Sequence, residues 1–304
     1  LINLGISIMS NIKIIFQLLC LLFISCSKEE DYFFNPSDSI FNSSLNITGT
    51  NQTLDLITWN IENFPKNNLT NLYVKQIIDS LNVDIIAMQE ITDMQSFNNI
   101  LDSLGNDWEG YRSGGINSDN QELAYIINTE NIELVSSPYT ILNDNSYYFA
   151  YREPYVLEIK YKDIDFILIN VHYKCCSGSE ERRLQASSLL YSYINTFLDD
   201  MRVVVLGDFN DLLIDDNNVF QPFLSDMNNF YFTDYSIAQS SNYFWSFPSW
   251  PSHLDHILIT NELFAYILDT QTVLVDGSLN GGLSAYDGYV SDHRPVMLKI
   301  LVND

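Results

Sequence analysis

Polar side chains able to hold a metal ion or move a proton follow the predicted buried strands of this sequence. They are Asn60, Glu90, Asp208, Asn210, Asp255, Asp292 and His293. Carboxylate and amide oxygens are the ligands that hard divalent cations prefer, so this set suits Mg²⁺, Mn²⁺ or Ca²⁺ better than Zn²⁺. A carboxylate beside a histidine holds the imidazole in one tautomer and favours its charged form. The pattern therefore indicates divalent-ion binding combined with acid–base chemistry.

Each of these positions, taken alone, has a simpler structural explanation. A single Asp or Asn after a strand is more often a turn residue or a helix cap. The segment 207–211 alone could be a tight turn or a fragment of a calcium loop, and a lone His172 is more often structural. Strand ends that share one rim of a sheet bring distant residues together, and this convergence favours a common site.

Hydrophobic periodicity predicts the strands and helices that carry these residues. Strands are predicted at 54–59, 83–88, 123–127, 155–161, 166–171, 203–206, 253–259 and 296–301. Helices are predicted over 74–81, over the segment from Phe97 to Leu104, and over 181–198. Strands that alternate with helices favour one α/β domain, which we expect to span residues 54–304.

Six short motifs in a fixed order resemble those of the endonuclease/exonuclease/phosphatase superfamily, which includes deoxyribonuclease I. They are WNIEN at 59–63, MQE at 88–90, NVH at 170–172, LGDFN at 206–210, LDHI at 254–257 and SDHRP at 291–295. The segment 152–154, which begins with Arg152, also resembles the arginine segment of the deoxyribonuclease I branch. The resemblance covers about residues 54–302, almost the whole predicted domain.

The resemblance implies a four-layer α/β/β/α sandwich and a metal-dependent phosphoesterase. Glu90 would hold the divalent cation, Mg²⁺ first, with Asn60 and Asp292 beside it. Asp208 would orient or deprotonate the attacking water, and Asn210 would help to position that water and the phosphate.

Charge stabilisation is the second task that the resemblance assigns. His293, paired with Asp255, would stabilise the charge of the transition state or transfer a proton. His172 and Arg152 would grip the phosphate oxygens. These roles agree with the chemistry, because attack on a phosphodiester anion requires that the substrate charge be neutralised.

The charge balance restricts the substrate. The 14 Lys and Arg residues face 39 Asp and Glu residues, which gives a formal charge of −25. Such a surface repels polyphosphates unless a metal or a local basic groove intervenes, which excludes a generic nucleic-acid binder.

An extracytoplasmic phosphodiesterase or nuclease is the first hypothesis. A phospholipid or inositol-phosphate esterase is the alternative, and a non-catalytic surface binding module is a third. No protein partner is predicted, and we expect a monomer.

The N-terminal segment resembles a bacterial lipoprotein signal over residues 1–26. The apolar run at 14–24 is too short to span a bilayer but suits a signal peptide, and Met9 is a plausible start. The following FISC at 23–26 resembles a lipobox, with Cys26 as the lipidated residue. An ordinary secretory peptide is the alternative. Residues 27–53 are predicted to be a polar tether, so we expect a membrane-anchored protein of the outer membrane, the periplasm or the cell surface.

Two further segments have no assigned role. Cys175 and Cys176 could form a strained vicinal disulfide or remain thiols, whereas metal binding by this pair alone is disfavoured. Residues 243–252 form an aromatic loop that could stack on bases, sugars or a lipid headgroup, or could pack as a local core.

Overall fold

Two β-sheets form the centre of the computed structural model, which describes residues 39–114, 121–216 and 218–302. The order of strands in the first sheet is β12 (Ile267–Thr272), β13 (Val296–Ile300), β1 (Leu54–Phe64), β2 (Ile85–Ile91), β4 (Glu122–Asn128) and β3 (Trp108–Arg112). In this sheet β1 and β2 are parallel, and β1 and β13 are antiparallel.

The second sheet has the same mixed character. Its order is β10 (Phe230–Phe232), β11 (Asp255–Thr260), β9 (Val203–Asp208), β8 (Ile164–His172), β7 (Tyr155–Tyr161) and β5 (Glu133–Leu134), and β6 (Tyr139–Thr140) also pairs with β7. Here β8 and β9 are parallel, whereas β11 runs antiparallel to β9.

The hydrophobic core lies between the two sheets. Alternate residues of each strand point inward, so that Leu56 and Ala87 of the first sheet belong to one buried cluster with Leu168 and Leu206 of the second. The central strands β1 and β2 are buried on their outer side as well, and removal of these side chains from water stabilises the layered structure.

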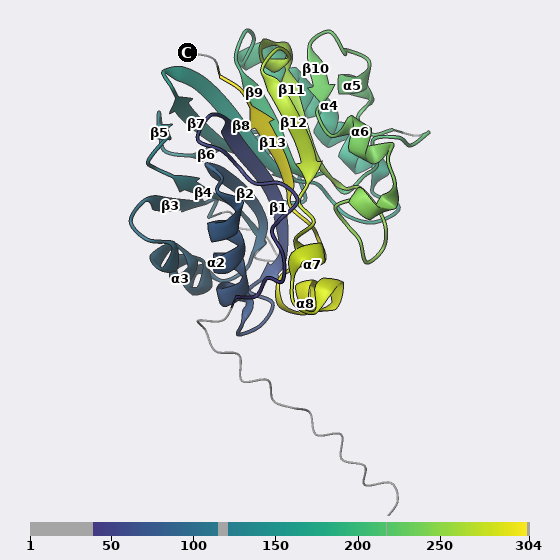
Figure 1. The fold of residues 1–304 in the computed structure, drawn as a ribbon. Helices are drawn as coiled ribbons and strands as arrows, with labels where there is room; N and C mark the ends of the chain where they lie inside the picture. The colour runs from purple at the N-terminus through teal and green to yellow at the C-terminus, as the bar shows by residue number, and fades with distance from the viewer. Residues whose placement is uncertain (1–38, 115–120, 217, 303–304) are drawn as a thin grey trace, which may run out of the picture. The chain divides into compact units, whose positions relative to one another are not determined.

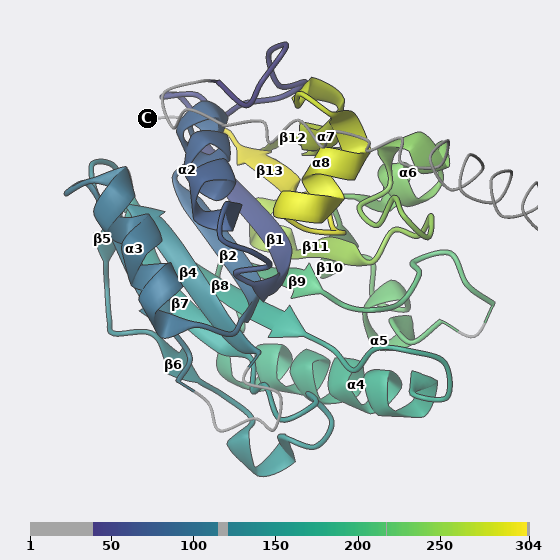
Figure 2. The same ribbon diagram turned by 90° about the horizontal axis from the view of Figure 1, so that it is seen from below.

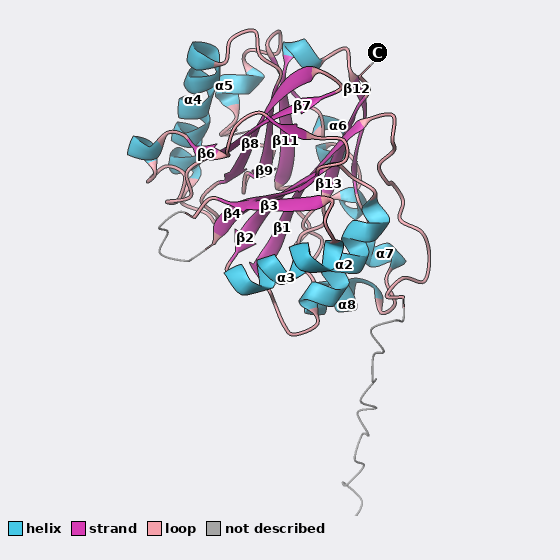
Figure 3. Ribbon diagram, turned by 90° about the vertical axis from the view of Figure 1, so that its left-hand side faces the viewer, coloured by secondary structure: helices cyan, strands magenta, loops and turns pink. Residues whose placement is uncertain are grey.

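Helices cover the outer faces of both sheets, as Figures 1 and 3 show. On the first sheet these are α2 (Thr70–Leu81), α3 (Met94–Leu104), α7 (Val275–Ser278) and α8 (Gly282–Tyr289). On the second they are α4 (Glu180–Phe197), α5 (Gln221–Leu224) and α6 (Tyr235–Ala238). Figure 2 shows α2 and α3 on one side of the strands and α4 on the other. The predicted four-layer α/β/β/α sandwich is confirmed.

Residues 39–53 differ from the predicted tether, because they pack on the domain. Ile40 is 1% exposed, and the Asn42 N–H donates to the Ser278 carbonyl. Gly49 donates to the Leu81 carbonyl at the end of α2. The polar composition of this segment therefore serves hydrogen bonds to the domain surface. Residues 1–38, with the predicted signal peptide, Cys26 and the first part of the tether, lie outside the described residues.

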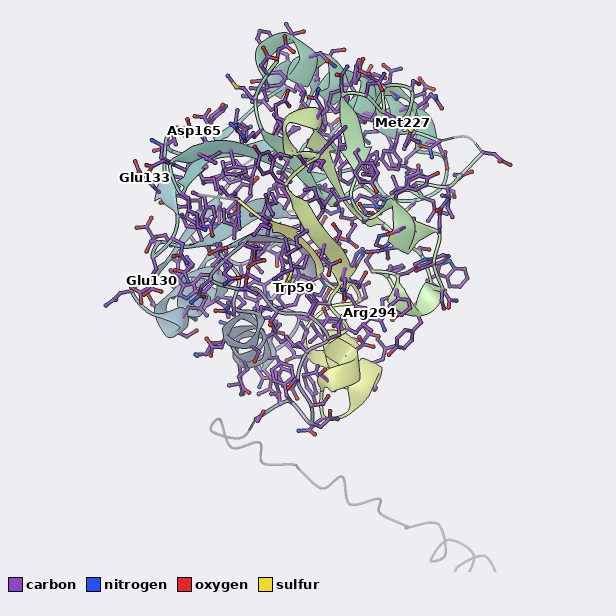
Figure 4. The ribbon with its side chains drawn as sticks, turned by 45° about the horizontal axis from the view of Figure 1, so that its top comes forward. Trp59, Glu130, Glu133, Asp165, Met227 and Arg294 are labelled. Carbon is purple, nitrogen blue, oxygen red and sulfur yellow. The ribbon has the colours of Figure 1, made fainter. Side chains whose placement is uncertain are left out.

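Three exposed acidic side chains lie at the end of the strands opposite to the motifs. Glu130, Glu133 and Asp165 are exposed and lie along one edge in Figure 4. Asp165 is at the beginning of β8, whereas His172 is at its end. Within the described segments, no helix combines the length and apolar character needed to span a membrane.

Candidate active site

The motif residues lie at one rim of the sandwich because of strand direction. Asn60 and Glu90 are near the ends of the parallel strands β1 and β2, and His172 and Asp208 end the parallel strands β8 and β9. Antiparallel β11 begins opposite Asp208, which pairs Asp255 with it in register. Chain direction alone therefore brings residues from both sheets to the same rim.

Bulges in β1 and β2 turn two of these side chains toward the second sheet. The β1–β2 register shifts between Asn60 and Phe64, and Glu90 has a φ of 67°, in the left-handed region. Such bulges re-aim side chains next to functional sites. Asn60 Nδ2 donates to Glu90 Oε1 over 3.2 Å and to Asp208 Oδ2 over 2.9 Å, and so links the two sheets.

Asp208 is a buried carboxylate held by amide donors. The Asn210 N–H donates to Asp208 Oδ1 over 2.9 Å, and Asn210 Nδ2 donates to Oδ2 over 3.0 Å. Burial raises the pKa of Asp208 to about 7, with Asp255 adding to the rise and His293 opposing it. A carboxylate with a pKa near neutrality can both accept a proton from water and release it again.

His293 and Asp255 form a buried charge pair beside Asp208. His293 Nδ1 donates to Asp255 Oδ2 over 2.7 Å. Burial opposes charge on the imidazole, but Asp255 and then Asp208 and Asp292 outweigh it and raise the pKa of His293 to about 10. The side chain is therefore an imidazolium at neutral pH, and its Nε2 lies 3.9 Å from Asp292 Oδ1.

The His172 ring lies beside the carboxylates of the site, whereas the Arg152 guanidinium bonds to backbone carbonyls and an amide. His172 Nε2 lies 3.5 Å from Asp208 Oδ2 and 3.8 Å from Glu90 Oε1. Burial, followed by Arg152 and His293, lowers the pKa of His172 well below its usual value, so the ring is neutral. Arg152 is also buried, and its guanidinium donates to the carbonyls of His172 and Tyr173 and to Gln121 Oε1. These contacts position the end of β8. The predicted contact of Arg152 with phosphate would need another N–H of the guanidinium.

Oxygen donors around Glu90 fit a divalent cation. Burial raises the pKa of Asp292 to about 6, and the nearby carboxylates of Glu62 and Glu90 add to this rise. Carboxylates that lie close enough to repel one another can be neutralised by a divalent cation. This agrees with the cation site predicted at Glu90, Asn60 and Asp292. Asn60 Oδ1 accepts from the Glu62 N–H over 3.0 Å and retains a second lone pair.

Among the residues that the structure describes, two buried clusters have enough Asp and His to resemble metal sites. In the first, Asp208, Asp255 and His293, the imidazolium has no lone pair to offer a metal.

The second cluster, Asp234, His253 and His256, is fully hydrogen-bonded within the protein. The Ser246 N–H donates to His253 Nδ1, so His253 Nε2 carries the proton that bonds Asp234. His256 bonds Asp234 through Nδ1 and the Asp211 carbonyl through Nε2, and both partners are acceptors. Both His256 nitrogens are therefore donors, and the cluster is a buried ion pair without a site for a metal.

Several residues that support the site had no predicted role. Gln89 Nε2 donates to Asn170 Oδ1 over 2.8 Å, which joins the sheets beneath the site. Tyr286 donates to the His293 carbonyl over 2.6 Å, and Ser291 donates to the Asn60 carbonyl over 2.8 Å. Gln89, Asn170 and Ser291 belong to the motifs, which is a signal that sequence reasoning could have used, whereas Tyr286 carries no such signal.

The aromatic loop 243–252 is partly packed and partly exposed. The ring of Phe247 contacts that of His293 with centroids 4.7 Å apart. Phe247 and Ser252 bond to each other through their backbones and close the turn that carries Trp250, which is 78% exposed. The local-core alternative therefore applies to Phe247, whereas stacking by the exposed residues of the loop stays a prediction.

Comparison with known proteins agrees with this geometry. The model of the Endonuclease/Exonuclease/phosphatase family matches residues 57–293. No match was found among the curated proteins.

Solved structures match at low identity. A humanized D. rerio TDP2 is 13% identical, with a TM-score of 0.65 over 83% of this chain and 100% of its own. The human Nocturnin catalytic domain with bound sulfate is 17% identical, with a TM-score of 0.61 over 82% and 93%. An endonuclease/exonuclease/phosphatase from Bacteroides vulgatus is 16% identical, with a TM-score of 0.61 over 83% and 99%. At these identities the likeness supports the shared fold.

Proposed function

This chain belongs to the endonuclease/exonuclease/phosphatase family and is a metal-dependent hydrolase of phosphoester bonds, and from this premise we propose that it is an extracytoplasmic phosphodiesterase that cleaves single-stranded nucleic acid. The observation that carries the reaction class is the convergence of Asp208, Asn210 and the His293–Asp255 pair at one rim.

Asp208 is the group that receives the proton of the attacking water. Its pKa of about 7 places it near the operating pH, and the amides of Asn60 and Asn210 hold its carboxylate in one orientation. Asn210 lies beside the same water position. General-base action of this kind contributes roughly 10²–10⁴-fold to a rate.

The imidazolium of His293 and a divalent cation would stabilise the negative charge of the phosphate. Asp255 keeps the His293 ring charged and oriented. We assign the cation to Glu90, Asn60 and Asp292, with Mg²⁺ as the first candidate, and a bound cation would neutralise the phosphate oxygens. His172 adds a neutral imidazole close to Asp208, and Arg152 holds the backbone of His172 in place.

The proposed preference for a single strand rests on charge and on exposed rings. A formal charge of −25 disfavours the dense phosphate array of a duplex. Trp250 is exposed on the turn whose base contacts His293 through Phe247, and Phe244 and Tyr243 of the same loop are exposed as well. Aromatic side chains stack on unpaired bases irrespective of their sequence. A related solved structure, D. rerio TDP2, holds a single-strand DNA product and is 13% identical to this chain.

The location is proposed from the N-terminal sequence alone. Residues 1–26 resemble a lipoprotein signal with Cys26 as the lipidated residue, which would tether the enzyme outside the cytoplasm. Metabolic labelling with a fatty-acid analogue tests this, since Cys26→Ser should abolish incorporation. Labelling that persists in that variant would refute the anchor.

A hydrolysis panel tests the substrate. The purified protein is assayed on single- and double-stranded DNA and RNA, on phospholipids and on inositol phosphates, with Mg²⁺, Mn²⁺ or Ca²⁺ and with a chelator. We expect cleavage of single strands that the chelator abolishes, and a loss of affinity in Trp250→Ala with little change in kcat. Release of a lipid headgroup or of inositol-bound phosphate without strand cleavage would overturn the nuclease proposal and favour the alternative.

A further inference from the structure

Cys175 and Cys176 are adjacent thiols close to the candidate active site, and the proposed hydrolysis does not use them. They lie between β8 and α4, three and four residues after His172. Both are free, Cys176 is exposed and Cys175 is partly exposed. The Cys176 thiol donates to Cys175 Sγ, and the two sulfurs are 2.6 Å apart.

The surroundings of the pair favour attack by Cys175. Cys175 Sγ accepts from Cys176 and also from Lys174 Nζ, which lies 3.6 Å away. Two donors stabilise negative charge as it develops on this sulfur, and a cation beside a partly exposed cysteine is the usual environment of a reactive one. Cys176 has a φ of 76°, so its backbone is already in the left-handed region that few non-glycine residues adopt.

We propose that Cys175 and Cys176 are a reversible oxidation site, which closes to a vicinal disulfide in the presence of a low-molecular-weight disulfide. The Cys175 thiolate attacks one sulfur of the oxidant, the sulfur–sulfur bond of the oxidant breaks, and one thiolate leaves. Cys176 then attacks the Cys175 sulfur and displaces the second thiolate. The two protons of the cysteines pass to the two thiolates, so the pair loses two electrons and the oxidant gains them.

Adjacency makes this cross-link easy to reduce. The Cα atoms of consecutive residues lie about 3.8 Å apart. Relaxed disulfides usually join Cα atoms about 4.4–6.8 Å apart, so a bond between neighbours is strained and more reducible. Strained or exposed disulfides are the labile ones, whereas relaxed buried ones resist reduction. The site therefore suits reversible oxidation.

Arg183 connects the pair to the catalytic turn. Its Nη1 donates to the carbonyls of Lys174 and Cys176, over 2.9 and 3.0 Å, on either side of the peptide that a vicinal disulfide would rotate. Its Nε pairs with Asp211 Oδ2 over 2.7 Å, and Asp211 follows Asn210 directly. Ring closure would weaken the hold of Arg183 on these carbonyls, and we expect the oxidised enzyme to have a lower kcat.

Peptide masses test the modification without reference to activity. The reduced full chain is exposed to oxidised glutathione, alkylated and digested, and the fragment with both cysteines is weighed, which separates it from Cys20 and Cys26. We expect this fragment to lose the mass of two hydrogen atoms. In Cys175→Ser or Cys176→Ser it should instead carry one glutathionyl group. Two glutathionyl groups or two alkylated thiols in the unsubstituted protein would overturn the proposal.

Activity tests the coupling, which rests on the proposed hydrolysis. Oxidised enzyme should lose kcat at least about threefold on whichever phosphoester the panel identifies, and dithiothreitol should restore it. The double variant Cys175→Ser/Cys176→Ser should not respond to the oxidant. Equal kcat in both redox states would overturn the coupling but not the modification, and the mass result stands whatever the substrate proves to be.

Discussion

Asp208 and His293 are opposite in charge, and their environments, more than their residue types, determine their protonation. Burial raises the pKa of Asp208, whereas Asp255 raises that of His293. At the residue scale the candidate site therefore contains a weakly acidic carboxyl group beside an imidazole that is charged at neutral pH. That combination suits one group that takes a proton from water and another that meets the resulting phosphate charge.

Asp208→Asn should abolish most activity without unfolding the protein. The amide keeps the size of the carboxylate but cannot accept the proton, so kcat should fall by roughly 10²–10⁴-fold. Steady-state kinetics and a thermal melt measure the two effects. Asp165→Asn, at the exposed beginning of β8, is the control and should behave as the unsubstituted protein does. Activity retained in Asp208→Asn would remove Asp208 from the mechanism.

At the element scale, the turn after β9 is held from two sides. Arg183 of α4 holds the Asp211 carboxylate, and His256 of β11 donates to the Asp211 carbonyl over 2.9 Å. Asp234, just before α6, fixes the His256 ring through a bond of 2.7 Å. Helix and strand thus position the Asp208–Asn210 turn through residues that do not face the substrate position.

His256→Asn and His256→Gln separate the two contacts of this ring. Asn places its amide nitrogen where Nδ1 lies and keeps the bond to Asp234, whereas Gln places it at Nε2 and keeps the bond to Asp211. If His256 positions the turn, kcat should fall roughly ten- to hundredfold in the Asn variant and less in the Gln variant. Melting temperatures show whether both are equally folded. A purely structural residue would give two equally active variants, which would contradict the role.

The far end of the first sheet contains a pH-sensitive carboxyl group. Burial raises the pKa of Asp84 to about 6, and the charge of Asp55 adds to the rise. Asp84 Oδ2 accepts from the Asp55 N–H over 2.8 Å. Because the folded pKa lies above the unfolded value of 3.8, the folded state binds the proton more tightly. Stability from this group is fully present below pH 3.8 and is lost as the pH rises through 6.

Asp84→Asn should remove this dependence. The amide oxygen can still accept from Asp55 N–H, and Asn131 can turn its own amide to match. The variant should be more stable than the unsubstituted protein by about 1–3 kcal/mol at pH 7.5, with the difference vanishing near pH 4. Denaturant unfolding at both pH values measures this, and a difference that is independent of pH would show that the carboxyl group does not titrate as described.

For the whole molecule, the charge of −25 is spread over surfaces that differ in function. Glu130, Glu133 and Asp165 lie along an edge at the end of the strands remote from His172 (Figure 4), whereas we propose that His293 and a cation face the substrate. We therefore expect the net negative charge to repel a polyanion at a distance, and the proposed cation with His293 to attract it at the site. This division distinguishes the protein from nucleases that gather DNA by a basic surface.

Added salt lowers the affinity of basic nucleases for nucleic acid, and for this protein we expect no such loss. Raising monovalent salt from about 10 mM to 150 mM shortens the screening length from about 30 to 8 Å and weakens the repulsion at distance. On a single-stranded substrate at constant Mg²⁺, kcat/KM should therefore stay constant or rise. A steep fall with salt, as counterion release produces, would show that a local basic surface dominates binding.

The family, the α/β class and the positions of the main elements follow from the amino-acid sequence. Hydrophobic periodicity is local, so β1, β2, β8 and β9 could be predicted from their own residues. The edge strands β3, β5 and β12 were missed, because their side chains are mostly only partly buried and their pattern is weak. The motif residues were identified without any knowledge of their contacts, and their catalytic roles stay predictions.

The orientation and charge of those residues depend instead on long-range packing. Trp59 donates to Tyr286 across 227 positions of sequence, and Asn60 reaches Asp208 across 148. Such contacts depend on how two sheets stack, which no local pattern encodes. The same holds for the burial that keeps His172 neutral and for the carbonyls that engage Arg152. Residue types carry the chemistry, but burial and long-range hydrogen bonds set the protonation and direction on which that chemistry depends.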